Sequence, residues 1–518
     1  MLAYVVYASV FIYTCSIRVA SGERFFVLFD DAMISMRYAH NFAHGSGLVW
    51  NPGEPPVEGF TNLLWTLYMS IFHLLPIAEA KICLAIQITG IVVQLASICL
   101  VKKISAEIFG KDSWLVLLPV ALTAFYLPLN SWSLQGMEVG VLCLILLAAA
   151  FIIQQSLATG KSALMAFVLF WFAIFVRMDS AVPLLASTIF LFLFDKSQRN
   201  KHLLQGSVAL VSSLGLLELF RFSYYHDWLP NTYYLKVTGF PPLSRIAQGA
   251  FNLYRFILQS NPWLFAIAAF AAFKQRASRF ILYLTVIVLG QFAYSSYVGG
   301  DAWEGWGNRY ITQAMPLFFI VFACGIRALS QIKLKAAGKF ESMPAKVAIV
   351  IALIALPSFN NVPGLRNLIL LDPPISWEPN KNRLELALAL KKVVLEHGHI
   401  AATLCGILPY FADRNCIDML GKCDPVVAKE EMHSLEKIAP EEYSWRWFYP
   451  GHMKWDYKHS IGDLAPDVVV ELWALPQDAQ PYLEGKYKKF LVDGFPVFLR
   501  LGSANIDWKS PLIKELPQ

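Results

Sequence analysis

The chain contains a series of apolar runs long enough to cross a bilayer. About 17 to 25 apolar residues span roughly 30 Å of hydrocarbon as a helix. With 56% hydrophobic and only 15% charged residues, the composition excludes a single soluble globule, in which about a quarter of residues are charged. The sequence predicts an all-α polytopic membrane domain of about eleven transmembrane helices, near residues 2–20, 82–101, 114–134, 138–156, 162–178, 180–194, 203–220, 262–273, 279–298, 311–330 and 346–358.

The loops between these runs are of two kinds. Some are rich in Lys and Arg, and the others hold aromatic residues, carboxylates, Gly and Pro. Because cytoplasmic loops collect Lys and Arg, eleven crossings with an inner N-terminus place every basic loop inside and all the chemically rich loops on the outer face. The apolar run 61–76 would break this alternation, so we interpret it as an interfacial or re-entrant segment.

The character of the chain changes after Pro363. Residues 1–360 form the predicted membrane domain, and residues 361–518 have the composition of a soluble α/β domain. An amphipathic helix is expected at 381–396, with strands at 399–405, 467–473 and 489–501. The parity of the crossings places this C-terminal domain on the extracytoplasmic side. There, a disulfide between Cys416 and Cys423 is left open.

Two adjacent carboxylates, Asp30 and Asp31, directly follow the first apolar run. Ionised groups beside hydrocarbon are costly and therefore indicate a functional site. One Asp is sufficient to cap the helix expected from Ala32, which leaves the second as a candidate general base. Arg37 lies about two helical turns further on, where it can pair with Asp30 or hold a phosphate.

Other carboxylates lie at the ends of the predicted crossings. Glu58 is at the mouth of an apolar run, where it is a candidate for binding an acceptor or a metal. Glu138 begins a helix, so a capping role competes with a role in the site. Arg177 and Asp179 lie between two short crossings, where they neutralise each other or line a substrate path.

Two outer loops combine aromatic and polar residues. In residues 224–236, His226, Asn231 and Lys236 accompany five aromatic residues, which suits a sugar or phosphate head group better than an aromatic belt does. In residues 299–310, Asp301 precedes Arg309, which opens the next crossing at the depth of lipid phosphates. We expect Arg37, Lys236 and Arg309 to bind a donor phosphate, and the other polar residues to bind substrate.

The order of these elements resembles that of the GT-C glycosyltransferases, and most closely the terminal arabinofuranosyltransferase (AftB-like) family. The stretches that carry the resemblance span nearly the whole chain: DDAMISMRYAHNFAHGSGLVWNPGE, VEGFTNLLW, GME, VRMDS, HDWLPNTYYLK, GGDAWEGWGNRY, CIDMLGKCD and PGHMK, the last of which contains His452.

The resemblance implies an inverting glycosyltransferase of the bacterial inner membrane. Such an enzyme moves a sugar, with arabinofuranose as one candidate, from a polyprenyl-phosphate donor to a hydroxyl of an extracytoplasmic glycan or lipid. An acidic residue of the first outer loop deprotonates the acceptor, which by position is Asp30 or Asp31. No metal ligands are assigned, although Glu58 and Asp301 leave a divalent cation open.

Two other function classes remain. Buried Glu138, Arg177 and Asp179 also suit a polytopic transporter or a flippase for lipid-linked saccharides, although transporters concentrate polar residues at midplane and these lie toward one side. In the second alternative, the C-terminal domain is a carbohydrate-binding module on an inert membrane anchor. The chain has neither a Gly-rich phosphate loop nor a soluble nucleotide-binding fold, and no nucleic-acid partner is expected.

Overall fold

The computed structural model describes residues 1–302, 307–331, 366–373, 376–434 and 446–516. The chain divides into two compact units, and each is described by itself. The first unit comprises Met1–Thr14, Ile86–Leu217 and Gly249–Pro374, and the second comprises Cys15–Ala85, Glu218–Gln248 and Ile375–Gln518.

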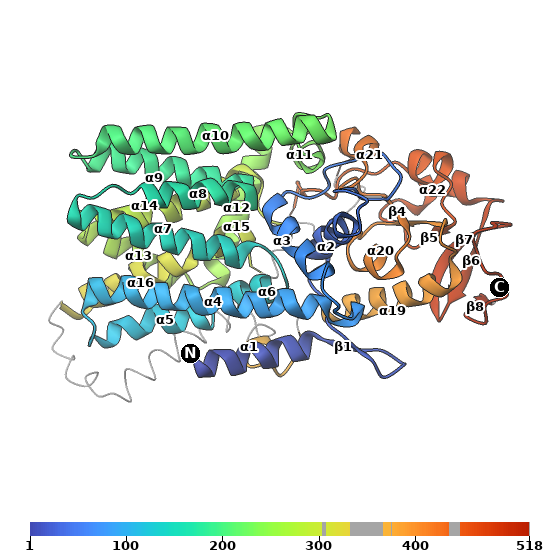
Figure 1. Ribbon diagram of the computed structural model, residues 1–518, viewed down its shortest axis with the longest axis horizontal. Helices are drawn as coiled ribbons and strands as arrows, with labels where there is room; N and C mark the ends of the chain where they lie inside the picture. The colour runs from blue at the N-terminus through green and yellow to red at the C-terminus, as the bar shows by residue number, and fades with distance from the viewer. Residues whose placement is uncertain (303–306, 332–365, 374–375, 435–445, 517–518) are drawn as a thin grey trace. The chain divides into compact units, whose positions relative to one another are not determined.

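The first unit is a bundle of apolar helices that run side by side (Figure 1). Their side chains are apolar on most faces, as is typical of helices that contact lipid or other buried helices. The bundle is built from α1 (Leu2–Cys15), α4 (Glu79–Phe109), η1 (Trp114–Val116), α5 (Leu117–Ala124), α6 (Leu127–Leu134), α7 (Val139–Thr159), α8 (Leu164–Val176), η2 (Met178–Ser180), α9 (Ala181–Phe194), α10 (Arg199–Tyr225), α12 (Pro242–Gln259), α13 (Pro262–Lys274), α14 (Arg279–Tyr297), α15 (Arg309–Thr312) and α16 (Met315–Gln331).

Four of the described helices, α4, α7, α10 and α14, are long and apolar enough to cross a membrane, and the number rises to six if two bent pairs each form one span. The pair α5 and α6 bends by 49°, and the pair α12 and α13 bends by 101°. The second bend has a local cause, because Asn261 has a φ of 73° and Pro262 begins α13. The mostly helical architecture is confirmed. The count of eleven stays a prediction, since several apolar helices are shorter than 18 residues and residues 346–358 lie outside the described residues.

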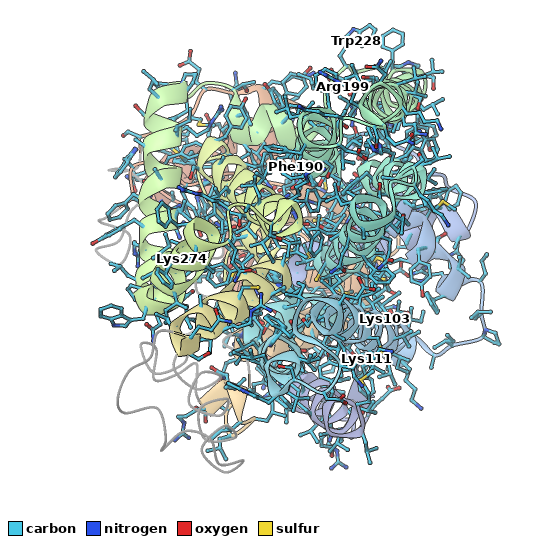
Figure 2. The ribbon with its side chains drawn as sticks, turned by 90° about the vertical axis from the view of Figure 1, so that its left-hand side faces the viewer. Lys103, Lys111, Phe190, Arg199, Trp228 and Lys274 are labelled. Carbon is cyan, nitrogen blue, oxygen red and sulfur yellow. The ribbon has the colours of Figure 1, made fainter. Side chains whose placement is uncertain are left out.

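Basic residues gather at one end of this bundle. Lys103 and Lys111 flank the C-terminal end of α4, Arg199 begins α10 and Lys274 ends α13. These helix ends lie at the left of Figure 1, and Figure 2 looks onto them. These four basic residues therefore share one end of the bundle, which agrees with the alternation of basic loops in the sequence.

The second unit contains a six-stranded sheet in the order β4-β3-β5-β7-β6-β8. Strands β4, β3 and β5 are parallel, and the remaining neighbours are antiparallel. The strands are β3 (His399–Ala402), β4 (Asn415–Asp418), β5 (Val468–Val469), β6 (Tyr487–Val492), β7 (Phe495–Arg500) and β8 (Ile513–Glu515). The expected strand at 489–501 is two strands of a hairpin, because Asp493 and Gly494 adopt the positive φ values (51° and 89°) of a tight turn.

Helices and a small hairpin complete this unit. The helix expected at 381–396 is α19 (Trp377–Val393), and the segment 61–76 folds as α3 (Leu63–His73), whose 11 residues are too few to cross a bilayer as a helix. The other elements are β1 (Ile17–Arg18), β2 (Arg24–Phe25), α2 (Asp30–Ala43), α11 (Asn231–Val237), α20 (Ile407–Ala412), α21 (Pro425–Lys429), η7 (Lys458–Asp463) and α22 (Pro476–Leu483). The predicted domain boundary at residue 360 lies outside the described residues and stays a prediction.

The outer edge of the sheet is covered by the loop after α2. The Asn51 side chain donates to the carbonyl oxygen of Cys416 on β4 at 3.0 Å and accepts from the Cys416 amide at 2.9 Å. Trp50 Nε1 donates to the same carbonyl at 2.7 Å. These contacts replace a neighbouring strand, so the edge of β4 does not present unpaired backbone groups at this position.

Candidate functional site

Asp30 does not cap its own helix. Helix α2 begins at Asp30, its N-cap position is Phe29, and no side chain caps it. Instead, Asp30 Oδ1 accepts a hydrogen bond from the backbone N–H of Ile407, the first residue of α20, at 3.0 Å. The carboxylate is 4% exposed. This position favours a role in holding the N-terminus of α20 over a role as catalytic base.

Asp31 forms an ion pair with Lys422. Both side chains remain partly accessible, with exposures of 13% for Asp31 and 16% for Lys422. The loop that carries Lys422 is shaped by Asp418, whose carboxylate accepts from the backbone amides of Leu420 at 3.0 Å and Cys423 at 2.8 Å. Sequence reasoning missed Lys422, although the Gly-Lys pair three residues after an Asp is a signal for a turn that presents a side chain.

His452 lies beside this ion pair as a neutral imidazole. Burial, followed by the positive charge of Lys422, lowers the pKa of His452 to about 3, and the charges of Asp31 and Lys236 also act on the ring. Its Nδ1 is 2.9 Å from the carbonyl oxygen of Pro450. Because a carbonyl oxygen only accepts, Nδ1 carries the proton in the neutral ring and Nε2 is an acceptor.

Lys236 belongs to the same cluster. It lies at the end of α11, and its stem packs against Gly451, where an added Cβ would come within 3.3 Å of the Lys236 Cε. The φ of 78° at Gly451 also favours glycine there. The structure therefore brings together Asp31, Lys236, Lys422 and His452, which we call the Asp31 cluster. Three of these four residues are predicted by the sequence.

Three predicted substrate residues have other surroundings within the second unit. Asn231 Nδ2 donates to the carbonyl oxygens of Gly421 at 2.8 Å and Lys422 at 3.0 Å, so it holds the loop that carries Lys422. Glu58 is buried in an ion pair with Arg221, at 2.5 Å, which the sequence reasoning did not single out. His226 is exposed and has a φ of 57° at the end of α10.

Arg37 is buried, and its side chain connects several backbone segments. Its guanidinium donates to the carbonyl oxygens of Trp50 at 2.9 Å, Pro409 at 2.7 Å and Arg414 at 2.8 Å, and to Asn51 Oδ1 at 2.9 Å. These contacts join α2 to the loop after it, to α20 and to the turn between α20 and β4. The arrangement favours a structural role over the expected binding of a donor phosphate.

The first unit holds a second polar cluster, formed by Glu138, Arg177, Asp179, Asp301 and Arg309, which we call the arginine cluster. Arg177 contacts Asp179 through Nε at 2.8 Å and Nη2 at 2.5 Å, and Glu138 through Nη1 at 3.1 Å. All five side chains are at least nine-tenths buried.

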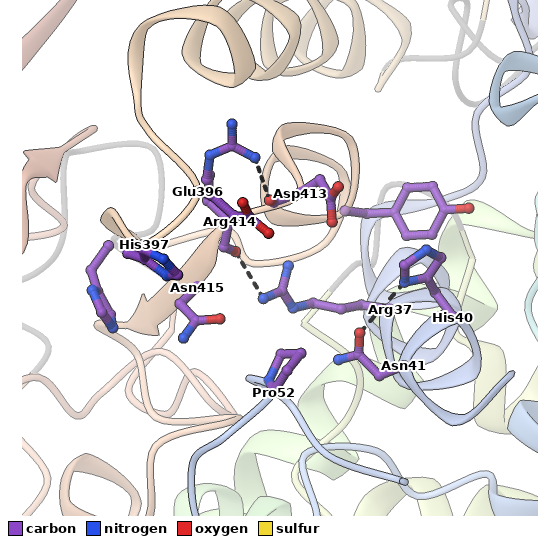
Figure 3. Close-up of a pocket in the computed structure, with 11 residues that line it drawn as sticks. Arg37, His40, Asn41, Pro52, Glu396, His397, Asp413, Arg414 and Asn415 are labelled. Carbon is purple, nitrogen blue, oxygen red and sulfur yellow. Dashed lines mark hydrogen bonds between the residues drawn. The ribbon is translucent and has the colours of Figure 1, made fainter. Parts of the chain in front are cut away.

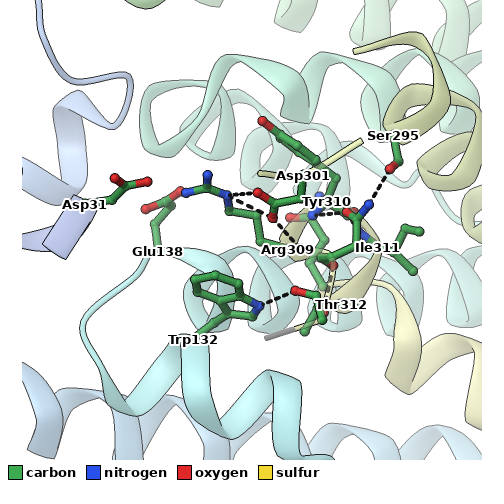
Figure 4. Close-up of polar contacts among 12 residues, drawn as sticks. Asp31, Trp132, Glu138, Ser295, Asp301, Arg309, Tyr310, Ile311 and Thr312 are labelled. Atoms are coloured by element: carbon green, nitrogen blue, oxygen red, sulfur yellow. Dashed lines mark hydrogen bonds and ion pairs between the residues drawn. The ribbon is translucent and has the colours of Figure 1, made fainter. Parts of the chain in front are cut away.

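Arg309 is held by Asp301 and by the ring of Trp132 (Figure 4). Its Nε lies 3.1 Å from Asp301 Oδ2, and its backbone amide donates to the same oxygen at 3.0 Å. The Arg309 guanidinium lies 5.6 Å from the centre of the Trp132 ring. The cluster contains one more carboxylate than guanidinium groups, so its residues can accept hydrogen bonds from hydroxyl groups more readily than they can hold an anion.

Neither a disulfide nor a metal centre is found within the described ranges. No group of three or more His, Cys, Asp or Glu side chains there is placed to hold a metal ion. The eight cysteines, all of them described, are free thiols. The disulfide left open between Cys416 and Cys423 is not present, and the nearest thiol contact of Cys416 is with Cys405, at an Sγ to Sγ distance of 3.9 Å.

Comparisons with known proteins support the fold. Residues 375–491 match a family model described as a domain of unknown function (DUF8728). A search of curated proteins found no significant match. The structure is similar to that of ArnT from Cupriavidus metallidurans bound to undecaprenyl phosphate, with a TM-score of 0.56 and 13% identity over 100% of this chain and 99% of that chain.

Two further solved structures are similar. ArnT from the same organism in the apo state has a TM-score of 0.55 and 11% identity over 96% of this chain and 97% of that chain. The apo oligosaccharyltransferase from Archaeoglobus fulgidus has a TM-score of 0.52 and 12% identity over 99% of this chain and 75% of that chain. These proteins belong to the GT-C superfamily, whereas the specificity of the AftB-like family stays a prediction. The chain therefore has the GT-C fold.

Proposed function

We propose that this protein is a membrane glycosyltransferase that moves a sugar from a polyprenyl-phosphate donor to a hydroxyl of an extracytoplasmic glycan or lipid. The observation that carries the proposal is the Asp31 cluster, in which an accessible carboxylate, two lysines and a neutral histidine lie together. The GT-C fold adds support, because one structure with this fold holds undecaprenyl phosphate.

Asp31 is the proposed general base. A glycosyl phosphate is already activated, so the protein needs a base for the acceptor hydroxyl and positive charge for the departing phosphate. Asp31 is partly accessible, whereas the Asp30 carboxylate is committed to the backbone of Ile407. The ion pair with Lys422 holds the Asp31 carboxylate in one orientation.

Lys236 is the proposed ligand of the donor phosphate. An ammonium group on a flexible stem can follow the phosphate as negative charge develops on it. Arg37 and Arg309 are less suited to this task, because protein carbonyls hold the first and Asp301 holds the second. His452 Nε2 is proposed to accept a hydrogen bond from a substrate hydroxyl, since its neutral ring presents a lone pair.

The arginine cluster is proposed to bind polar groups of a substrate at the end of the helical bundle. Its carboxylates are held in fixed orientations by Arg177 and Arg309. Carboxylates held in this way can accept hydrogen bonds from sugar hydroxyls without reorganising. We further propose that the protein lies in the bacterial inner membrane with its C-terminal residues outside, and that arabinofuranose is one candidate for the sugar.

The test is sugar transfer by the purified full-length protein in lipid nanodiscs, with a radiolabelled polyprenyl-phosphate pentose or hexose as donor. Asp31→Asn removes the proposed base and should reduce kcat by about 10²–10⁴-fold. The matched control is Asp227→Asn, which breaks an Asp–Lys pair of 2.9 Å outside the cluster. Equal rates for the two variants would rule out Asp31 as the base. Movement of the intact donor across vesicles without transfer would instead assign the protein as a flippase.

A further inference from the structure

The second unit contains a polar pocket that is separate from the Asp31 cluster (Figure 3). The pocket has a volume of about 590 Å³ and is formed by the C-terminal half of α2, the turn between α19 and β3, and the segment from Tyr410 to Asn415. About 300–1,000 Å³ is usual for a small-ligand site. We call it the histidine pocket, because His40, His397 and His399 line it.

The two arginines that line the pocket have structural roles. The Arg37 guanidinium is held by three carbonyl oxygens and by Asn51, as described above. Arg414 donates through Nε to the Val394 carbonyl oxygen at 2.9 Å and through Nη2 to that of Lys391 at 3.0 Å. Because both guanidinium groups are bound to the backbone, they fix the shape of the pocket and offer little to an incoming anion.

Three of the other polar side chains in the lining are available to a ligand. The Glu396 carboxylate, the His397 imidazole and the Asn415 amide make no hydrogen bond with another described residue. Asp413 is exposed and stands at the end of α20 with a φ of 53°, a conformation that Asp tolerates better than most residues. The pocket thus presents acceptors in its carboxylates, and both donors and acceptors in its amide and imidazole groups.

We propose that the histidine pocket binds a neutral oligosaccharide segment of the glycan acceptor. Sugar hydroxyls donate and accept hydrogen bonds, which matches the mixed set of free groups. Arg37 and Arg414 are balanced by Glu396 and Asp413. The positive charge that His399 gains on protonation is matched by Glu54, 3.6 Å away, so the pocket has no excess charge to attract an anion. The Tyr410 ring adds an aromatic surface of the kind that sugar sites use.

The position on α2 separates this subsite from the proposed base. Asp31 and His40 are nine positions apart on the continuous helix α2, which corresponds to about 13 Å along the helix axis. The pocket is therefore suited to hold a part of the glycan away from the reacting hydroxyl. The identification of the bound glycan as the acceptor rests on the proposed function. Binding of a neutral glycan to the pocket can be measured independently of sugar transfer.

The experiment uses the full-length protein in nanodiscs and saturation-transfer difference NMR. The probes are three neutral linear tetrasaccharides (α-1,5-arabinotetraose, maltotetraose and cellotetraose), with inorganic phosphate as the anionic competitor. The pocket variant carries Glu396→Ala and Asn415→Ala. The matched control is Glu484→Ala, an exposed glutamate after α22.

We expect at least one neutral tetrasaccharide to bind the wild type and the control, and to bind the pocket variant at least about tenfold more weakly. Phosphate should not displace it. Absence of binding by all three sugars, equal binding by the pocket variant, or displacement by millimolar phosphate would each overturn the proposal. Sugar transfer is measured in parallel with a short alkyl acceptor. Failed transfer with intact glycan binding would reject the proposed function alone, and intact transfer without glycan binding would reject the pocket alone.

Discussion

The carboxylate of Asp30 accepts a hydrogen bond from the backbone amide of Ile407, at 3.0 Å and across 377 positions of the chain. Its neighbour Asp31 instead pairs with Lys422 and remains partly accessible. Two adjacent residues of the same type thus have different surroundings, because successive helical side chains point about 100° apart. The difference separates a structural role from a proposed catalytic one, and the two can be tested separately.

Asp30→Ala should destabilise the protein more than it changes the chemical step. The substitution leaves the Ile407 amide without its acceptor and should cost about 1–3 kcal/mol of stability. The measurement is the melting temperature in nanodiscs, together with kcat well below that temperature. Asp30→Asn is the matched variant, because an amide oxygen still accepts a hydrogen bond. A collapse of kcat in Asp30→Asn at unchanged melting temperature would identify Asp30 as the base instead.

Lys422→Met should reduce kcat by about 10–100-fold, because Asp31 loses the partner that orients it. Lys422→Arg keeps the charge and should restore most of the rate. The measurement is kcat and KM determined separately. We expect most of the loss in kcat, a pattern that a purely structural role for Lys422 would not produce. If Lys422→Arg is as slow as Lys422→Met while both melt as the wild type does, charge is not the property that matters at this position.

Gly406→Ala should disrupt the contact between α20 and α2. An added Cβ would come within 1.9 Å of the Asp30 carbonyl oxygen, and a backbone atom cannot move aside easily. The expected cost is about 1–3 kcal/mol, seen as a lower melting temperature. Gly215→Ala is the control, since nothing lies within 4 Å of its added Cβ and alanine favours a helix interior. It should melt at or above the wild-type temperature.

Asp467 should stabilise the sheet of the second unit in a pH-dependent way. Its carboxylate, 1% exposed, accepts from the His399 amide at 2.9 Å and from Ser503 Oγ at 2.6 Å. Burial alone would raise the pKa of Asp467, but these hydrogen bonds and those from Asn505 and Arg500 outweigh burial and lower its pKa below 3.8.

The sign of the effect follows from that lowered pKa. The stabilisation is present above the unfolded pKa and is lost as the pH falls through the folded pKa. Asp467→Asn should therefore melt well below the wild type at pH 7, by an amount that corresponds to about 2–4 kcal/mol. The difference in melting temperature between the wild type and Asp467→Asn should become smaller under acid conditions. Asp463→Asn, at an exposed position, should show no gap at either pH. A gap for Asp467→Asn that stays constant down to pH 3 would contradict the ionic explanation.

The parts of the structure that depend on local sequence were predicted well. Every other predicted apolar run within the described residues lies on helices, but the run 2–20 is helical only to Cys15 and continues into strand β1 (Ile17–Arg18). Apolar runs are predicted well because the length of an apolar stretch can be read from one continuous segment. The sequence analysis did not predict the bend at Pro262 or the hairpin turn at Asp493, although both sites contain residues that favour turns. Strand β4 was also missed.

The contacts of the candidate site depend on residues far apart in sequence. The structural role of Asp30 follows from its hydrogen bond with Ile407, and that of Arg37 from its hydrogen bonds with Pro409 and Arg414. An isolated sequence shows that a buried charge needs a partner, but it does not say which one. Lys422 illustrates the limit: it lies inside a stretch that the resemblance quotes, yet only the folded chain pairs it with Asp31.

The hydrogen bonds between Asn51 and the edge of β4 have a consequence for folding during translation. The two residues that exchange these hydrogen bonds are 365 positions apart, so the early segment leaves the ribosome long before its partner exists. A fragment that begins at residue 376 lacks this segment and would leave the border of its sheet uncovered, ready to pair with another copy. Nascent chains must therefore keep the early segment available until Cys416 has been synthesised, and β4 then closes onto a segment that was made first.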